Sequence, residues 1–444
     1  MLKAGFARTE ITPPLGVKLG GYPHYPRHNT GKHDPLYGAC MYLESKGVEV
    51  AMVTLDLLMI SKIYVADIRK RAEAACGIPA ENIMISCSHT HSAPRCSSAL
   101  DTESILQGQD KPLEYIEELI EKVAEVIVRA KKESFEGCFA SSVEVCGAES
   151  GVGGNRRVRG GPHDPLVTVM AVKDKDERVR GALVNYTLHP TFIHEWSDVC
   201  TADYPYYVKL EIEETYPHAL TGFAQGASGN QSSRYYRNGE SYDEAERVGR
   251  AVGRAACRAI KRAEWQEELE IKTVSKTYEL EFRNFGTVEE RKRIAERDKA
   301  VYEELYAKYG KSENREEYYL WQNANLRHLG SEKQLTYAMA LESGKTIEVC
   351  VEENPTELQL IRVGETCVVG LQGEWFVEYG LYIKAMAGFG TVIVNELTNG
   401  CHPGYMYTPE SLITGGYEAD TSMLKEDFGI KTLDRVIKLA KALK

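Results

Sequence analysis

Short runs of apolar residues recur along the chain and predict a series of β-strands. They cover residues 48–60, 83–85, 166–172, 181–187, 357–363, 366–371 and 391–396. Several are apolar throughout, which is typical of strands covered on both faces. Between them, apolar residues at spacings of three and four predict helices at residues 63–75, 114–132, 242–263 and 375–387. The pattern predicts a layered α/β fold in which helices flank a mixed β-sheet core.

One segment breaks this pattern. Residues 289–329 are highly charged, have helical spacing and interrupt a strand-rich C-terminal half. They predict a helical excursion at about residues 287–330. It is either a solvated pair of helices or a lid whose tyrosines and Trp321 close over a pocket. Because we find no internal repeat and no low-complexity linker, we expect a single domain over residues 1–444.

Composition and charge narrow the possible functions. Of the 444 residues, 43% are hydrophobic and 27% are charged, which is ordinary for a folded protein. The formal net charge of −11 opposes attraction to phosphate backbones, so a nucleic acid is not an expected partner. No window approaches the ~18 apolar residues of a membrane span, and the N-terminus lacks the pattern of a signal peptide. We therefore expect a cytoplasmic protein without a membrane anchor.

The stretch "ENIMISCSHTHSAPRC" holds the first candidate for chemistry. His89 and His91 follow an apolar run and lie two positions apart. If the strand extends to His91, its period of two turns both imidazoles to the same face, where they could share a metal ion. Neutral imidazole suits zinc, copper or iron. The alternative is that each histidine hydrogen-bonds a nearby carbonyl group.

Other chemically capable residues also stand near the ends of predicted strands, where α/β proteins usually place their sites. His189 ends one strand, and Glu374 follows Gly373 at a predicted strand-to-helix turn. Two loops rich in glycine and other small residues hold further candidates, which are Ser228, Ser232, Ser233, Tyr405 and Tyr417. Each position taken singly also has a structural explanation, such as a hydrogen bond or a turn. No HExxH, Walker loop, dinucleotide fingerprint or GxSxG motif gives a stronger local signal.

The order and wording of these stretches together resemble the neutral/alkaline non-lysosomal ceramidase family, a group of zinc-dependent amidases. "ARTEITPPLGVKLGGY" is similar to the opening of its N-terminal catalytic domain, and "SCSHTHSAP" to its histidine signature. "GVGGNRR", "LHPTFIHEWSDVCTADYP", the glycine-serine loop, the "GE" turn and "GYMYTPES…GGYEAD" follow in the family's order. The resemblance spans nearly the whole chain and implies a short member of the family.

This resemblance implies roles for eight residues. Its zinc ligands would be His89, His189, Glu374 and Tyr405, and the groups around the substrate amide would be His91, Arg156, Ser232 and Tyr417. The chain departs from the family pattern at five positions, which are Ala93, Tyr206, Asn230, Gln231 and Ser233. His194 lies outside the pattern, and it could either support a ligand histidine or belong to ordinary packing.

The resemblance also frames the substrate. Ceramide-cleaving members of the family are secreted or membrane-facing and carry an additional C-terminal β-sandwich, neither of which we expect here. We therefore expect a zinc-dependent amidase that uses a zinc-activated water on a small soluble N-acyl compound. The alternatives are a zinc-dependent esterase or lactonase, a ceramide hydrolase proper, or a non-catalytic zinc-binding relative.

Overall fold

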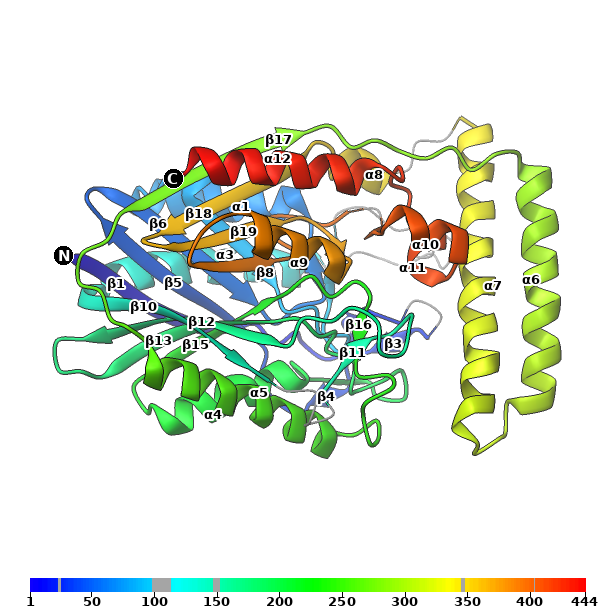
Figure 1. Ribbon diagram of the computed structural model, residues 1–444, viewed down its shortest axis with the longest axis horizontal. Helices are drawn as coiled ribbons and strands as arrows, with labels where there is room; N and C mark the ends of the chain where they lie inside the picture. The colour runs from blue at the N-terminus through cyan, green and yellow to red at the C-terminus, as the bar shows by residue number, and fades with distance from the viewer. Residues whose placement is uncertain (23–24, 98–112, 147–151, 345–347, 403) are drawn as a thin grey trace.

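A curved, eight-stranded mixed sheet forms the larger half of the structure (Figure 1). The computed structural model describes residues 1–22, 25–97, 113–146, 152–344, 348–402 and 404–444. The strand order is β15-β13-β12-β10-β1-β5-β6-β8, and only the pairs β13–β15 and β6–β8 are parallel. Its strands are β1 (Leu2–Glu10), β5 (Tyr37–Ser45), β6 (Val48–Leu55), β8 (Ile83–Cys87), β10 (Phe135–Val145), β12 (Leu166–Asp174), β13 (Val179–Tyr186) and β15 (Leu220–Gln225).

A second, four-stranded sheet packs against the inner face of the first. Its order is β17 (Ile271–Tyr278), β18 (Thr356–Val363), β19 (Thr366–Leu371) and β21 (Thr391–Asn395), with β19 and β21 parallel. One buried cluster contains side chains from both sheets, including Met52, Met84 and Leu183 from the larger and Ile361 and Val368 from the smaller. Because the sheets cover each other's inner faces, their strands are apolar on both sides, as the sequence pattern predicts.

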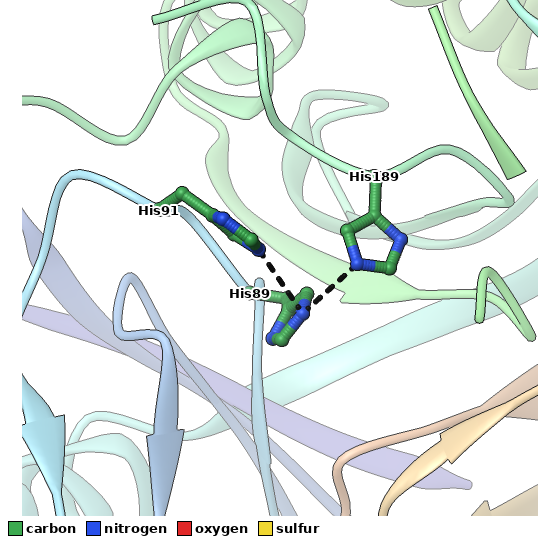
Figure 2. Close-up of side chains that lie close together, drawn as sticks. All are labelled: His89, His91 and His189. Atoms are coloured by element: carbon green, nitrogen blue, oxygen red, sulfur yellow. Dashed lines mark hydrogen bonds between the residues drawn. The ribbon is translucent and has the colours of Figure 1, made fainter. Parts of the chain in front are cut away.

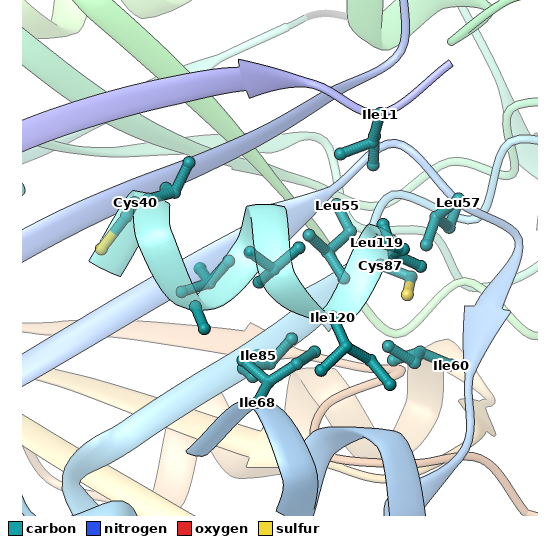
Figure 3. Packing of buried hydrophobic residues seen from close by; sticks show 14 of the residues in the cluster. Ile11, Cys40, Leu55, Leu57, Ile60, Ile68, Ile85, Cys87, Leu119 and Ile120 are labelled. Atoms are coloured by element: carbon teal, nitrogen blue, oxygen red, sulfur yellow. The ribbon is translucent and has the colours of Figure 1, made fainter. Parts of the chain in front are cut away.

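Helices cover the outer faces of both sheets. Helices α1 (Lys62–Cys76) and α3 (Leu113–Lys132) pack on β5, β6 and β8 through a cluster that includes Leu55, Ile68, Ile85 and Ile120 (Figure 3). Helices α4 (Tyr204–Thr215) and α5 (Tyr242–Arg262) cover β12, β13 and β15. Helices α9 (Val377–Met386) and α12 (Phe428–Ala442) cover the smaller sheet. The predicted layered α/β fold with a mixed sheet core is confirmed.

Short elements occupy the ends of the layers and the connections. They are β2 (Lys18–Leu19), β3 (Arg27–His28), β4 (Gly31–Lys32), β7 (Met59–Ile60), η1 (Ala80–Asn82), β9 (Arg95–Cys96), β11 (Gly154–Asn155), β14 (Val199–Cys200), β16 (Gln231–Ser232), α8 (Glu348–Glu352), β20 (Glu374–Trp375), β22 (Tyr405–Met406), α10 (Pro409–Thr414) and α11 (Tyr417–Thr421). Gly151, the first residue of the quoted "GVGGNRR" stretch, lies outside the described residues.

Two predicted strands are shorter in the structure. The run at residues 48–60 breaks after Leu55, because the buried Asp56 carboxylate accepts hydrogen bonds from the Tyr37 backbone N–H at 2.8 Å and from the Lys209 ammonium at 2.5 Å. The strand that begins at Ile83 ends at Cys87 and does not reach His91. Periodicity missed β1, β5, β10, β15 and β17. In β1, β10 and β17, polar residues interrupt the apolar pattern.

The charged excursion forms two long helices that stand side by side at one end of the molecule (Figure 1). They are α6 (Val288–Tyr309) and α7 (Arg315–Glu342), so the excursion extends beyond its predicted end near residue 330. Helix α7 is fixed to the body at two places. The Tyr319 hydroxyl donates to the Arg234 carbonyl at 2.6 Å, and the Gln334 amide donates to the Asp420 carbonyl at 2.9 Å. Helix α6 lies outside α7 and is largely solvated.

The larger sheet curls so that its two edges meet. Strand β15 at one edge packs against β6 and β8 at the other. A Cβ atom at Gly222 of β15 would lie 2.8 Å from Oγ1 of Thr54 in β6, so this approach requires glycine. The curl brings the chain segments that follow β8 and β13 close together, although the two strands stand far apart in the sheet order.

Among the described residues, none of the helices combines the length and the apolar character needed to cross a membrane.

We expect Ile68→Ala in α1 to lower the free energy of unfolding by about 2–5 kcal/mol, because it leaves a cavity between the helix and the sheet. Ile68 is 0% exposed, whereas Ile63 in the same helix is 44% exposed and gives a matched control. Chemical denaturation should show a much smaller change for Ile63→Ala. Equal losses in the two variants would contradict the described packing of α1.

Candidate metal centre and active-site cavity

His89 lies just after β8, in a turn that the backbone itself enforces. Its φ of 67° is unusual for a residue with a side chain. Hydrogen bonds from the backbone N–H groups of Ser88 to the Leu55 carbonyl at 2.8 Å and of His89 to the Leu57 carbonyl at 3.0 Å hold this turn. The histidines therefore share a site because the chain turns, and the prediction that they share one face of a continuous strand is wrong.

His189 reaches the same place from the other edge of the sheet. It follows β13 and is fully buried. Its Nδ1 donates to the Ser228 carbonyl at 2.8 Å, and Nδ1 of His89 likewise donates to the Leu58 carbonyl at 2.9 Å. Since a carbonyl oxygen only accepts, each neutral imidazole keeps its hydrogen on Nδ1 and offers an unprotonated Nε2.

The two Nε2 atoms meet a carboxylate. The two Nε2 atoms lie 3.1 Å apart (Figure 2 shows the imidazoles). Oε2 of Glu374 lies 3.3 Å from Nε2 of His89 and 3.2 Å from Nε2 of His189. Gly373 makes this placement possible, because its φ of 75° turns the chain from β19 into β20. Strand β20 pairs with β22, where Tyr405 lies opposite Glu374.

This arrangement fits a metal ion. Two nitrogen lone pairs and a carboxylate oxygen face one another, so a cation or a shared proton must lie among them. Burial, together with Arg156, lowers the pKa of His189 to about 4, which disfavours a proton on its ring. Ligands at ~2.0–2.1 Å from a tetrahedral ion are roughly 3.3 Å apart, close to the distances between these atoms. His91 completes a group of three histidines whose ligand atoms lie within 4.8 Å of one another.

His91 lies between this cluster and a cavity. Its Nε2 is 3.4 Å from Nε2 of His89, and its Nδ1 is buried without a hydrogen-bond partner among the described residues. Burial, followed by the nearby His89 and His189, holds the pKa of His91 well below its usual range. The ring is therefore neutral near neutral pH. It borders a cavity of about 230 Å³.

The cavity brings together the other residues that the family resemblance singles out. Its lining includes Arg156, Ser232, Tyr405 and Tyr417. The two tyrosine rings lie 6.1 Å apart, and the Arg156 guanidinium lies 5.7 Å from the centre of the Tyr405 ring. Burial opposes the charge of Arg156, but Glu418 outweighs it and raises the arginine's pKa; the two form an ion pair at 2.8 Å. These residues come from four separate chain segments.

Of the two interpretations of His194, the support of a ligand histidine is wrong. Its Nε2 accepts from Arg237 at 2.8 Å, and its Nδ1 contacts Glu195 at 2.8 Å, so it belongs to the cavity wall. The support of His189 comes from elsewhere. The Ser228 hydroxyl lies 3.2 Å from Nδ1 of His189 and donates to Glu396 at 2.6 Å. The sequence offered a signal for Glu396, which stands at the end of a predicted strand.

Helix α7 forms one wall of the cavity. Five of its residues line it, namely Tyr318, Gln322, Asn325, Leu326 and Leu329. Trp321 does not face the cavity and packs between Tyr306 of α6 and Tyr318. Helix α7 thus borders the cavity, whereas Trp321, which the lid interpretation included, joins the two helices instead, and the solvated interpretation describes α6.

Fold and site together define a layered α/β protein with a candidate metal centre at the ends of its strands. No family model matches the chain. A neutral ceramidase of Drosophila pseudoobscura pseudoobscura is 25% identical over 241 residues, which are 50% of this chain and 33% of that protein. The match thus spans about a third of the relative's length. The resemblance to neutral ceramidases that the sequence indicates is confirmed by this relative.

Solved structures show the same fold. The crystal structure of neutral ceramidase from Pseudomonas aeruginosa matches with a TM-score of 0.75 and 18% identity, covering 100% of this chain and 74% of that chain. A ceramidase complexed with C2 matches with a TM-score of 0.74 and 16% identity, covering 100% of this chain and 75% of that one. The whole described architecture, including both sheets, is therefore a known arrangement.

We expect the purified protein to hold about one divalent metal ion per chain, because the cluster offers several unprotonated ligand atoms. Elemental analysis should show loss of the metal in His89→Ala and in His189→Ala. Glu374→Gln should keep the fold and weaken metal binding, since it removes the carboxylate. The exposed His28 gives a control, and His28→Ala should retain the metal. Full occupancy in both of the first two variants would refute the site.

Proposed function

We propose that the protein is a cytoplasmic, zinc-dependent amidase that hydrolyses the carbon–nitrogen bond of a small, soluble N-acyl compound. The observation that carries this proposal is the meeting of His89, His189 and Glu374 beside a cavity that His91 also borders. The likeness to proteins named ceramidase supports an amide as the bond that is cleaved.

The proposed zinc ligands are His89, His189, Glu374 and Tyr405. Imidazole nitrogen and carboxylate oxygen are ordinary zinc ligands, while a phenolic oxygen is an unusual one. Tyr405 is included because it lies opposite Glu374 in the β20–β22 pair and is buried. When bound, zinc supplies an activated water and a Lewis acid for the amide carbonyl.

Residues of the chain supply the rest of the chemistry. Negative charge develops on the carbonyl oxygen, and in this proposal the Tyr417 hydroxyl, with the Arg156 guanidinium or His91, stabilises it, each donor by about 3–4 kcal/mol; all three residues line the cavity. His91 carries a proton from the attacking water to the leaving amine, a role that suits an imidazole that is neutral near neutral pH. Ser232, on the same cavity, hydrogen-bonds the substrate amide.

Three observations support a small substrate taken from solution. The cavity volume of about 230 Å³ lies below the roughly 300–1,000 Å³ typical of sites for drug-sized ligands. Helix α7 closes one side of it. The net charge of −11 opposes binding to anionic membrane surfaces, where a long-chain lipid amide would be presented.

His91→Ala should retain the metal and lower kcat by about 10²–10⁴-fold, because it removes the proton carrier and no proposed ligand. Elemental analysis and steady-state kinetics on the same preparation check both halves. Loss of metal in His91→Ala equal to that in His89→Ala would instead make His91 a ligand.

We expect short N-acyl amines to be hydrolysed with a higher kcat/KM than long-chain ceramide in detergent, because a compact cavity leaves two long chains unburied. A matched panel should also contain esters and lactones. A tenfold or greater preference for ceramide, about 1.4 kcal/mol in the transition state, would contradict the small-substrate proposal. Hydrolysis of esters alone would favour an esterase, and a metal-loaded protein inactive on the whole panel would favour a non-catalytic relative.

A further inference from the structure

Arg234 occupies a fixed position on the wall of the cavity. It follows Ser232 of β16, and its backbone N–H donates to the Ser232 hydroxyl at 3.2 Å. Its backbone carbonyl accepts from the Tyr319 hydroxyl at 2.6 Å and from Arg315 at 3.3 Å. The same residue therefore joins the loop of Ser232 to the docked end of α7. Its side chain lines the cavity beside Arg156.

The guanidinium of Arg234 has aromatic neighbours and lacks an acidic partner. It lies 5.4 Å from the centre of the Tyr319 ring and 5.8 Å from that of Tyr235. Within the part of the chain that the structure describes, no carboxylate forms an ion pair with it. The other two arginines of the cavity differ, since Arg156 is paired with Glu418 and Arg237 with Glu240.

Glu418, which lines the same cavity, is already shared by two other arginines. Glu418 accepts from Arg156 at 2.8 Å through one oxygen and from Arg157 at 2.7 Å through the other. Glu195 lies against His194 at 2.8 Å. Five charged residues line the cavity, namely Arg156, Arg234, Arg237, Glu195 and Glu418. Two more, Arg157 and Glu240, form ion pairs with lining residues, which makes four guanidiniums and three carboxylates.

Outside the metal centre and its Glu374, the guanidinium of Arg234 is thus the one of these charges without an opposite partner, in a protein whose net charge is −11. A partly buried cation without a counter-ion is costly, and a ligand that supplies one negative charge removes that cost. The planar fork of arginine matches a carboxylate through two parallel hydrogen bonds. Tyr318 and Asn325 of α7 line the same cavity and offer neutral hydrogen-bond donors.

We propose that Arg234 binds a single carboxylate group of the substrate, so that the preferred substrates are small amides with one carboxylate. This inference rests on the proposed amidase function. One excess charge matches a carboxylate monoanion better than a phosphate dianion. The carboxylate lies either on the amine half, as in an N-acetyl amino acid, or on the acyl half, as in an N-succinyl amine. Arg234 is then a residue that determines specificity.

Matched pairs of substrates test the proposal on the metal-loaded protein. One pair is N-acetyl-phenylalanine and N-acetyl-phenylalaninol, in which a hydroxymethyl group replaces the carboxylate. The other is N-succinyl-benzylamine and N-butyryl-benzylamine. We expect kcat/KM to favour the carboxylate member of at least one pair by about 10–100-fold, mainly through KM, as for a hydrogen-bonded charge pair. The pair that shows this preference identifies the half that carries the carboxylate.

Variants separate recognition from a structural role. Arg234→Gln should reduce the ratio of kcat/KM between carboxylate and neutral members to about one, and Arg234→Lys should restore part of it. The exposed Arg254→Gln serves as the control and should keep the ratio. A ratio unchanged in Arg234→Gln, including an equal loss on both members, would overturn the proposal. The same result is expected if the metal ion, and not Arg234, binds the carboxylate.

The outcomes distinguish the two levels of inference. Equal hydrolysis of charged and neutral members by the unaltered protein would reject the role of Arg234 and leave the amidase function standing. Failure to hydrolyse any member, with metal present, would reject the amidase function itself. Binding of N-acetyl-phenylalanine measured by calorimetry then decides the role of Arg234, which requires weaker binding in Arg234→Gln.

Discussion

The meeting of two unprotonated imidazole nitrogens with a carboxylate oxygen is the interaction on which the rest of the site depends. His89 and His189 are both fixed as Nε2 acceptors by backbone carbonyls that take their Nδ1 hydrogens. Glu374 adds a third acceptor at 3.2–3.3 Å. Such a group is stable only around a cation or a proton, and the lowered pKa of His189 makes a metal ion the better fit.

The geometry of the two sheets brings these three groups together. The two histidines follow β8 at one edge of the larger sheet and β13 beside the other edge, and the carboxylate follows β19 of the smaller sheet. Only a curled sheet, closed by the contact of β15 with β6 and β8, brings these three strand ends together. The glycine at position 222 permits the closest approach. The packing of the core therefore also positions the residues of the site.

The cavity adds a second electrostatic feature to the metal centre. Helix α7 docks onto the carbonyls of the loop after β16 and forms one wall of the cavity. Because Glu418 serves both Arg156 and Arg157, Arg234 contributes a charge that the described protein does not balance. Under the proposed role of Arg234, this charge favours small anionic ligands over neutral lipid chains.

Sequence alone determined the α/β layers, the bounds of α1, α3, α5 and α9 to within two residues, and the choice of candidate residues. The apolar period of α1, α3 and α5 and the motif order sufficed, since both are local properties of the chain. Sequence did not determine how His89 and His91 share a site, because the turn with positive φ depends on contacts with Leu55 and Leu57 across the sheet. It also missed the partners of His194 and the unpaired charge of Arg234. These depend on which carboxylates lie within a few ångströms, and only the tertiary structure brings segments hundreds of residues apart to that distance.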